Sequence, residues 1–333
     1  MSAFARSGFV LPPGVFRLVL ALAVVASHVT RLDIGRLAVL AFFFLSGFWS
    51  SRIWAQKFGS GAAMRFYAAR WLRIAPLYLI VLLTWTAIRA TPLHFENFTL
   101  FGIATTYRDP LYVSWSLDIE LQFYLLLPLL FGMVAEASAG LTILVALVIG
   151  AAGCWLVQAT GLVIIAKYLP LFALGALTDL KGWRPGPRTA AVSLAGFAAM
   201  SAATLLTPFW TKNVGDPFNR DIWAFFWLLP LVPWMARMLT VRSSRLDRHL
   251  GNLSYPLYLV HLPAIMFMTH AFSVAIPVRL AGVGLALVVA VVVYVLVDRP
   301  LDRWRVRLTE ARAPQPEARA HGPEAAQPAG GDS

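Results

Sequence analysis

The chain has 333 residues, of which 59% are hydrophobic and 13% are charged, and its net charge is +12. A soluble domain carries about twice that share of charged residues, and the apolar residues form runs long enough to cross a bilayer, which takes about 20 helical residues. The composition therefore excludes an ordinary soluble domain and predicts a polytopic membrane protein built as one helical bundle. The single cysteine, Cys154, excludes a disulfide framework within the chain.

Ten apolar runs are expected to span the membrane, with the first retained rather than cleaved as a signal peptide. They cover residues 14–32, 36–53, 74–90, 113–134, 140–159, 162–180, 189–207, 221–240, 252–272 and 278–298. The basic, aromatic stretch 57–73 between the second and third runs is typical of an interfacial amphipathic helix. Residues 1–310 should form one membrane domain, and the Ala-, Pro-, Glu- and Gly-rich segment 311–333 a disordered cytoplasmic tail.

The basic residues distribute unevenly when the N-terminus is placed in the cytoplasm. Of the 28 Lys and Arg residues, 20 then fall on the inner side. Because cytoplasmic loops collect Lys and Arg, this asymmetry predicts both termini inside and the 90–112 loop outside. It also accounts for the net charge of +12 without a nucleic-acid partner.

Arg17 and His28 stand eleven positions apart in the first run. Three helical turns take about 10.8 residues, so the two lie on nearly one face, roughly 16 Å apart along the axis. An arginine near a helix end can extend its side chain to the membrane interface. A histidine in a membrane helix is a hydrogen-bonded core residue about as often as it is a functional one. The functional alternative is a face that runs from a cationic inner mouth to a titratable group deep in the bundle.

Two carboxylates, Asp118 and Glu120, lie about five to seven residues inside the fourth run. Carboxylates at such depth are rare and are functional candidates. Because this run goes from outside to inside, we expect Glu120 at about the depth of His28.

Two further groups of residues are weaker evidence for function when each is taken alone. Arg70 and Arg73 lie three residues apart on one turn and can clamp phosphate groups, although inner-loop arginines are common. In the ninth run Tyr258 and His261 share a face, and such a pair is also frequent as hydrogen-bonding glue between membrane helices.

Together these motifs, in this order, resemble the acyltransferase-3 family of integral-membrane O-acyltransferases over about residues 11–305. The matching segments are Arg17-x10-His28, Phe42 to Trp49 (FFFLSGFW), Arg70-x-x-Arg73 with Pro76 and Tyr78, Trp115-Ser116-Leu117-x-x-Glu120 with Phe123, Tyr124 and Pro128, and Leu253 to His261 (LSYPLYLVH). Two positions depart from the family pattern: Gly14 stands where many members have Asp, and Asp298 where they have Glu. The extracytoplasmic esterase-like domain of many members is also not expected here.

The resemblance implies an all-α bundle of about ten helices in a bacterial cytoplasmic membrane, surrounded by lipid. The implied reaction is transfer of an acyl group, often acetyl, from acyl-CoA to a hydroxyl of a carbohydrate such as a cell-surface polysaccharide, which can be lipid-linked. Acyl-CoA would be a co-substrate, with no permanently bound cofactor or metal.

The resemblance also assigns roles to residues. Arg70 and Arg73, with Arg17, would hold the phosphates of the donor. His28 would be the general base, supported by Glu120, although an acyl-histidine intermediate remains open. The predicted substrate-binding residues are Trp115, Asp118, Tyr258 and His261.

Two other classes of function are compatible with a chain of many membrane spans. A transporter or flippase also uses intramembrane His, Glu and Arg, but a transporter built of repeats should show symmetry between its halves, and these motifs concentrate in the first, second, fourth and ninth runs. A structural subunit of a glycan-export complex would not need His28 and Glu120 at matched depth.

Overall fold

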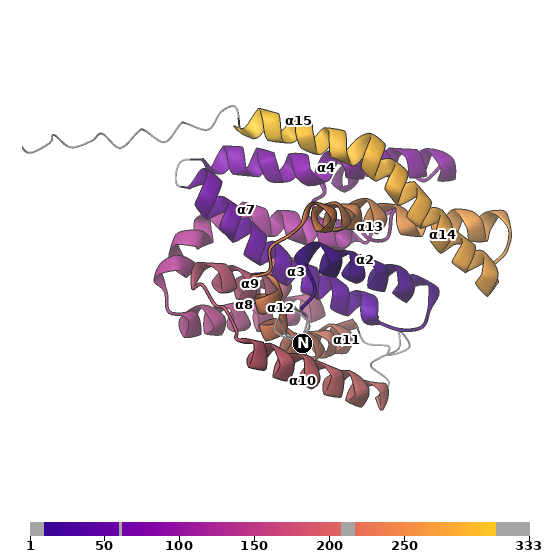
Figure 1. The fold of residues 1–333 in the computed structure, drawn as a ribbon. Coiled ribbons are helices and arrows are strands. Elements are labelled where there is room, and N and C mark those ends of the chain that lie inside the picture. The colour runs from indigo at the N-terminus through magenta and orange to yellow at the C-terminus, as the bar shows by residue number, and fades with distance from the viewer. Residues whose placement is uncertain (1–9, 60–61, 208–216, 311–333) are drawn as a thin grey trace, which may run out of the picture.

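The computed structural model describes residues 10–59, 62–207 and 217–310. The described chain is helical throughout and contains no strand (Figure 1). Its elements are α2 (Pro13–Val29), α3 (Ile34–Ile53) with its continuation η1 (Trp54–Phe58), α4 (Ala63–Arg89), α5 (Phe95–Thr99), α6 (Ile103–Thr106), α7 (Trp115–Glu136), α8 (Ala139–Thr160), η2 (Ile165–Tyr168), α9 (Leu169–Leu180), α10 (Pro187–Leu205), α11 (Pro217–Leu228), η4 (Leu229–Leu231), α12 (Val232–Met238), α13 (Arg245–Ala271), α14 (Ile276–Val293), η5 (Tyr294–Asp298) and α15 (Arg299–Glu310). The tail expected over 311–333 lies outside the described residues.

Five helical segments of the described chain are long and apolar enough to cross a membrane. They are Ile34–Phe58, Ala63–Arg89, Trp115–Glu136, Ala139–Thr160 and Ile276–Leu308. Two of the other expected spans are short helices, since α2 has 17 residues and α9 has 12. The multi-pass membrane class is therefore supported, whereas the expected count of about ten spans is not confirmed.

The basic stretch 57–73 does not form an interfacial helix of its own. Lys57 belongs to η1 at the end of α3, and α4 runs without interruption for 27 residues from Ala63 to Arg89. Arg70 and Arg73 therefore lie within the long helix α4, and both face a cavity inside the protein. The physical reason is that one face of this stretch has protein neighbours: Arg70 is buried, and the fully buried Phe66 packs edge-on against Trp54, whereas Trp71 on another face is exposed.

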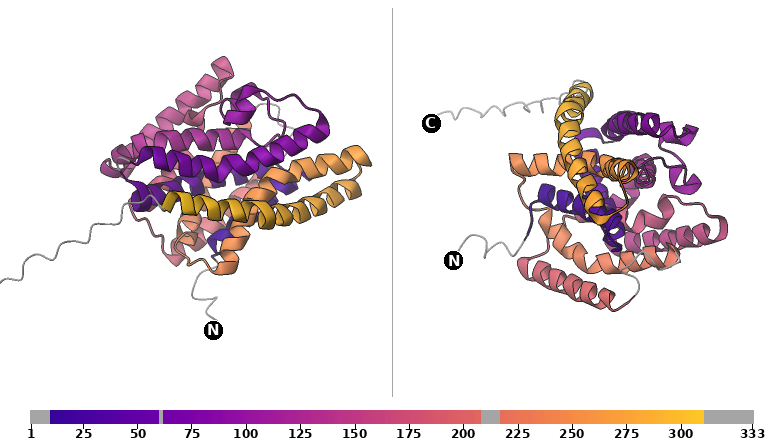
Figure 2. Two further views of the ribbon diagram at one scale, coloured as in Figure 1. Left: turned by 90° about the horizontal axis from the view of Figure 1, so that it is seen from above. Right: turned by 90° about the vertical axis from the view of Figure 1, so that its right-hand side faces the viewer.

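The helices α2 and α3 lie in the middle of the molecule, with α4 and α15 on one side and α10 on the other (Figures 1 and 2). α13 packs against both α14 and α2, and α3 packs against α9 and α2. Glycines permit the closest approaches, because a Cβ on Gly47 of α3 would lie 2.1 Å from the carbonyl oxygen of Phe172 in α9. On the same interface, a Cβ on Gly175 would lie 2.0 Å from the carbonyl oxygen of Phe44.

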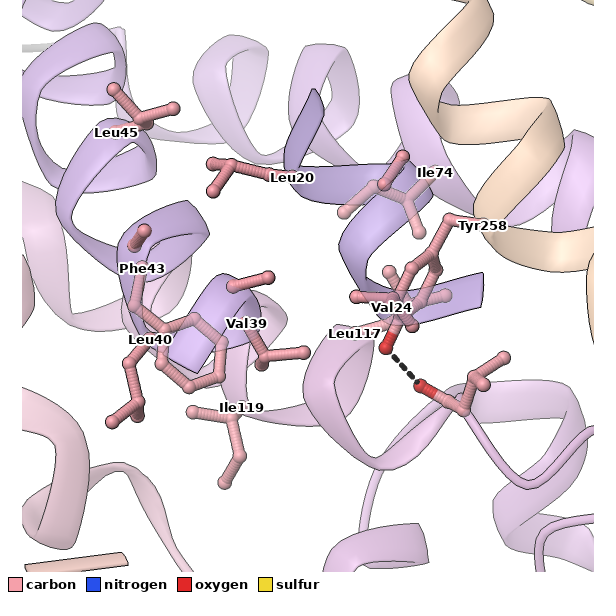
Figure 3. Packing of buried hydrophobic residues seen from close by; sticks show 14 of the residues in the cluster. Leu20, Val24, Val39, Leu40, Phe43, Leu45, Ile74, Leu117, Ile119 and Tyr258 are labelled. Carbon is pink, nitrogen blue, oxygen red and sulfur yellow. Dashed lines mark hydrogen bonds between the residues drawn. The ribbon is translucent and has the colours of Figure 1, made fainter. Parts of the chain in front are cut away.

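Apolar side chains of α2, α3, α4, α7 and α13 meet in one buried cluster (Figure 3). Its members include Leu20, Val24, Val39, Leu40, Phe43, Leu45, Ile74, Leu117, Ile119 and Tyr258. This cluster joins the helices that carry the predicted site residues, so it fixes how those residues stand relative to one another.

Candidate functional site

A cavity of about 460 Å³ opens among six helices. α2, α3, α4, α7, α13 and α15 each contribute to its wall. It lies toward the end of the bundle at which α2 and α13 begin, because Pro13, Gly14 and Arg248 belong to its lining. We call this end the arginine end, since arginines from four helices line the cavity there: Arg17, Arg70, Arg73, Arg248 and Arg305. The three predicted donor-binding arginines are thus brought into one space.

The packing of α2 against α13 shapes this end. A Cβ on Gly14 would lie 1.8 Å from the carbonyl oxygen of Asp247, so any side chain there would collide with α13. The Asp247 carboxylate instead accepts a hydrogen bond of 2.8 Å from the backbone N–H of Val15. An acidic group therefore stands beside the N-terminal turn of α2, where the positive end of a helix favours it, but α13 supplies it.

Arg73 is already compensated by a carboxylate. Its Nη1 lies 2.9 Å from Oδ1 of Asp298, and its guanidinium sits 5.5 Å from the centre of the Tyr255 ring. Only 4% of the Asp298 side chain is exposed. Because a buried ion pair leaves a costly lone charge when one member is removed, Asp298 holds Arg73 at the cavity wall.

Arg70 and Arg17 differ from Arg73 in their surroundings. Arg70 is only 9% exposed, and its Nε has no hydrogen-bond partner among the described residues. Its guanidinium lies over the rings of Phe66 and Tyr124, at 5.7 and 5.6 Å. Within the described parts of the chain neither Arg70 nor Arg17 forms an ion pair. Since a buried charge without a counter-ion is costly, this wall is suited to an anionic ligand.

Glu120 is the only carboxylate among the described residues that line the cavity. Its Oε1 accepts hydrogen bonds from the Ser46 hydroxyl at 2.6 Å and from the Tyr124 hydroxyl at 2.5 Å. Hydrogen bonds to a carboxylate are strong and short, so Glu120 is held firmly between α3 and α7. Within the described chain it forms no ion pair with the cavity arginines.

The far end of the cavity is closed by a hydrogen-bonded pair. The hydroxyls of Tyr258 and Ser116 lie 2.7 Å apart, and the Tyr258 hydroxyl also donates to the carbonyl oxygen of Val113 at 2.9 Å. Tyr258 is packed among Val24, Leu117 and other members of the buried cluster (Figure 3). Both hydroxyl residues line the cavity, so they form its boundary on this side.

His28 and His261 lie together beyond that boundary. Their ring centres are 5.2 Å apart, and His261 is 6.0 Å from the Tyr258 ring. His261 is fully buried, its Nδ1 lies 2.7 Å from the carbonyl oxygen of Tyr258, and its Nε2 has no hydrogen-bond partner among the described residues. Because a carbonyl can only accept, Nδ1 carries the proton and the Nε2 of the neutral ring is basic. Neither histidine is among the residues that line the cavity, whereas Glu120 is.

The other two predicted substrate-binding residues also lie outside the cavity lining. Asp118 is fully buried and accepts hydrogen bonds from the backbone N–H of Ala104 and from the side chain of Gln122, at 2.9 and 2.8 Å. Trp115 is partly exposed, and the guanidinium of Arg36 lies 5.7 Å from its ring centre. Asp118 therefore ties α6 to α7, while the partly exposed Trp115 ring packs against Phe43 and Tyr168.

Sequence reasoning missed several cavity residues. Ser46 falls within the Phe-x-x-Ser-Gly segment, but its bond to Glu120 joins positions 74 residues apart. In the sequence, Arg248 and Arg305 contribute only to the excess of basic residues on the predicted inner side. The amphipathic pattern of the segment after Asp298 could have indicated that Arg305 faces the protein. One face of α15 packs against α4, and the opposite face is exposed.

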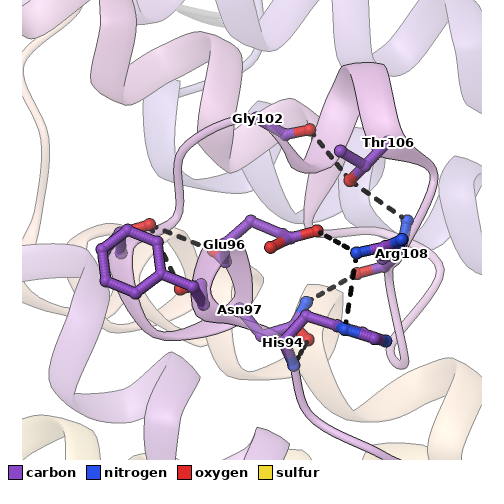
Figure 4. A network of polar contacts seen from close by, with 8 residues as sticks. His94, Glu96, Asn97, Gly102, Thr106 and Arg108 are labelled. Atoms are coloured by element: carbon purple, nitrogen blue, oxygen red, sulfur yellow. Dashed lines mark hydrogen bonds and ion pairs between the residues drawn. The ribbon is translucent and has the colours of Figure 1, made fainter.

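The loop between α4 and α7 has its own polar network (Figure 4). The Arg108 guanidinium lies 3.5 Å from the Glu96 carboxylate, and the Asn97 side chain donates to the Arg108 carbonyl at 2.6 Å. Asp109 accepts from the backbone N–H groups of Leu111, Ser114 and Trp115 and so holds the start of α7. Burial raises the pKa of the Asp109 carboxyl above its usual range, although these hydrogen bonds oppose the rise.

Comparison with known proteins agrees with this arrangement. A family model described as an acyltransferase domain matches residues 14–297. Searches of curated proteins and of solved structures found no significant match. The matched region contains the whole run of motifs from Arg17 to His261 and the helices that build the cavity, apart from α15. The chain therefore belongs to the acyltransferase-3 family, and it is a multi-pass membrane acyltransferase.

Proposed function

We propose that this acyltransferase moves an acyl group, with acetyl as the simplest case, from acyl-CoA to a hydroxyl of a carbohydrate. The acceptor would be a cell-surface or exported polysaccharide, or its lipid-linked precursor, at a bacterial cytoplasmic membrane. One observation carries the donor assignment: Arg17 and Arg70 line one cavity beside Arg73, and neither forms an ion pair with another residue that the structure describes.

The donor fits the cavity by charge and by shape. Guanidinium groups bind phosphate oxygens through paired N–H donors, and the arginine end supplies several. The narrow pantetheine arm would then follow the apolar wall formed by Val39, Ile74 and Leu117 toward Tyr258. In this proposal acyl-CoA is a substrate that binds and leaves, and the protein retains no cofactor.

His28 is proposed as the general base. It takes the proton of the acceptor hydroxyl as that oxygen attacks the thioester carbonyl carbon. The C–S bond then breaks, and the CoA thiolate leaves and receives the proton back from the imidazolium. An imidazole is suited to this exchange near neutral pH. In the alternative mechanism, the His28 imidazole attacks the thioester carbonyl carbon and carries the acyl group, which then passes to the acceptor hydroxyl.

The geometry supports His261 as the group that orients His28. Its proton is committed to the Tyr258 carbonyl, so its Nε2 can accept a hydrogen bond from the ring N–H of His28. Glu120 then acts on the donor side, where its carboxylate, held by Ser46 and Tyr124, balances the arginines. Trp115 offers its accessible ring to the sugar of the acceptor, and the thioester passes Tyr258 to reach His28.

The topology completes the proposal. With both termini in the cytoplasm, the arginine end faces the pool of acyl-CoA, and the loop over 90–112 faces the opposite side. Donor and acceptor then approach the same bundle from opposite sides of the membrane. This separation gives a reason for a membrane-embedded enzyme.

The test uses membrane vesicles that contain the full chain, labelled acetyl-CoA and the envelope glycan of the same bacterium. Transfer of label to a base-labile ester on the glycan is expected, and His28→Ala should abolish it. Label that appears on no hydroxyl acceptor, with donor binding intact, would contradict the proposed acceptor class. Movement of unmodified glycan across the vesicle membrane would instead favour a flippase.

A further inference from the structure

The arginines of the cavity differ in exposure. Arg70 is 9% exposed, the side chains of Arg305 and Arg73 are 15% and 20% exposed, and Arg248 is exposed. The first of these lies within α4, whereas Arg248 lies in the first turn of α13 and Arg305 in the last helix. The cavity therefore combines the buried Arg70 with two arginines from other helices, Arg248 and Arg305. We call these two the rim arginines, since Arg248 is exposed.

The Arg248 guanidinium is held in place by one hydrogen bond and has further N–H donors for a ligand. Its Nη1 donates to the carbonyl oxygen of Ser243 at 2.9 Å, and a guanidinium has four further N–H donors. The helix start that carries Arg248 is itself held in place, because Ser244 caps α13 through the backbone N–H of Asp247 at 3.1 Å. A rim arginine on a capped helix end presents its remaining donors with little loss of conformational freedom.

Arg305 is positioned by its own helix. Its Nε and Nη2 lie 3.2 and 2.6 Å from Oδ1 of Asp302, one turn earlier in α15. α15 packs along α4 (Figure 1), so Arg305 reaches the cavity wall on the side of Arg70. Both rim arginines are thus supplied by elements other than the one that carries the Arg70-x-x-Arg73 motif.

The chemistry of the donor orders its charges along the same axis. Coenzyme A carries a diphosphate between the pantetheine arm and the ribose, and a separate 3′-phosphate on the ribose. When the thioester lies deepest, the diphosphate follows at the inner arginines and the 3′-phosphate stays nearest the rim. The inference rests on the proposed function, since it takes acyl-CoA as the donor.

We propose that Arg248 and Arg305 form a rim subsite for the ribose 3′-phosphate, and that this subsite makes the enzyme prefer CoA over 3′-dephospho-CoA. The deeper arginines bind both nucleotides alike, because both carry the diphosphate. The rim subsite acts only on the ligand that has the extra phosphate.

The experiment measures the dissociation constants of CoA and 3′-dephospho-CoA for the full-length protein purified in detergent. Wild type is expected to bind CoA about tenfold more tightly, the effect of one charge-assisted contact at a partly exposed site. Arg248→Ala and Arg305→Ala should each weaken CoA binding and leave the affinity for dephospho-CoA unchanged. The unchanged affinity also reports that each variant is folded.

Matched controls separate a subsite from general surface charge. Arg245→Ala removes an exposed arginine one turn earlier in α13, and Arg303→Ala removes one in α15; neither residue lines the cavity. Both controls should keep the wild-type preference. If a rim alanine variant fails to bind either ligand, Arg248→Gln and Arg305→Gln are measured in its place.

The outcomes distinguish the two proposals. CoA binding with no preference in wild type overturns the rim subsite and leaves the proposed function standing. A preference that survives Arg248→Gln and Arg305→Gln, or that is lost equally in the controls, also overturns the subsite. Failure of wild type to bind either nucleotide overturns the acyl-CoA donor and the subsite with it.

Discussion

The rings of His28 and His261 lie with their centres 5.2 Å apart, although they belong to α2 and α13 and are separated by more than two hundred residues. The buried Nε2 of His261 has no hydrogen-bond partner within the described chain, and its Nδ1 is held by the Tyr258 carbonyl. Under the proposed mechanism, two imidazoles this close together would act as a proton-handling pair.

His28→Ala should lower transfer per folded molecule by about 100- to 10,000-fold, the usual contribution of a general base. The variant should still express and still bind acyl-CoA, because His28 does not line the cavity. The measurement is transfer of labelled acetyl, normalised to folded protein in detergent. Wild-type turnover in the folded fraction would move the base elsewhere, with His261 as the next candidate.

Glu120→Gln should reduce transfer by about 100-fold, because it removes the carboxylate charge from a cavity rich in arginine. Tyr124→Phe is the matched control: it removes one hydrogen bond to Glu120 and leaves the charge. That control should cost less than tenfold. Equal losses in both variants, measured as initial rates at saturating donor, would assign Glu120 a structural role only.

Arg70→Ala and Arg73→Ala should both weaken acyl-CoA binding, by roughly 1.5–3 kcal/mol each, but they should differ in stability. Arg73→Ala leaves the buried Asp298 carboxylate unpaired, which costs about 3–5 kcal/mol. Arg70→Ala removes a buried cation with no ion pair within the described chain, so the unfolding temperature should stay the same or rise. Arg70→Lys should restore binding only in part if the phosphate contact is bidentate.

Binding by calorimetry and thermal unfolding in detergent check these outcomes. Adding Asp298→Asn to Arg73→Ala should recover most of the lost stability without restoring donor affinity. Unaltered donor affinity in the folded Arg70→Ala, Arg73→Ala double variant would remove these residues from the donor site.

The topology is testable by cysteine labelling in intact cells, after Cys154→Ser removes the single native thiol. The structure guides the choice of position, because Asn97 is fully buried and would label poorly on either side. Tyr107→Cys is preferable, since Tyr107 is 75% exposed. We expect labelling of residue 107 without permeabilisation, and labelling of Arg245→Cys only after it. The reverse pattern would overturn the predicted orientation.

Gly47→Ala should destabilise the bundle by about 1–3 kcal/mol, because the new methyl group would collide with the Phe172 backbone across the α3–α9 interface. Gly175→Ala should act in the same way on the other side of that interface. Gly132→Ala is the control, since its Cβ would meet no atom within 4 Å. Thermal unfolding in detergent checks whether Gly47→Ala and Gly175→Ala unfold at lower temperature than Gly132→Ala. Equal unfolding temperatures for Gly47→Ala and Gly132→Ala would show that the helices can shift apart.

The sequence by itself determined the membrane class, most helix positions and the candidate chemistry. Long apolar runs dictate membrane helices because unpaired backbone groups are costly in lipid, and helical periodicity places Arg17 and His28 on one face of α2. The rare intramembrane charges then pointed to Glu120 and to the paired arginines of α4. The motif order was specific enough to indicate the family before any contact was known.

Only the tertiary structure decided which faces meet. Periodicity states that a residue lies on a given face, but not which helix that face packs against. Ser46 is identified as a partner of Glu120 only from the packing of α3 against α7. Asp298 is likewise identified as the partner of Arg73 only from the tertiary contact between their two segments. The expectation that Glu120 lies at the depth of His28 comes from helix geometry and stays a prediction, whereas the structure shows that α13 brings His261 next to that histidine. Contacts between residues far apart in the chain depend on the shapes of whole helix surfaces, and local spacing does not encode those shapes.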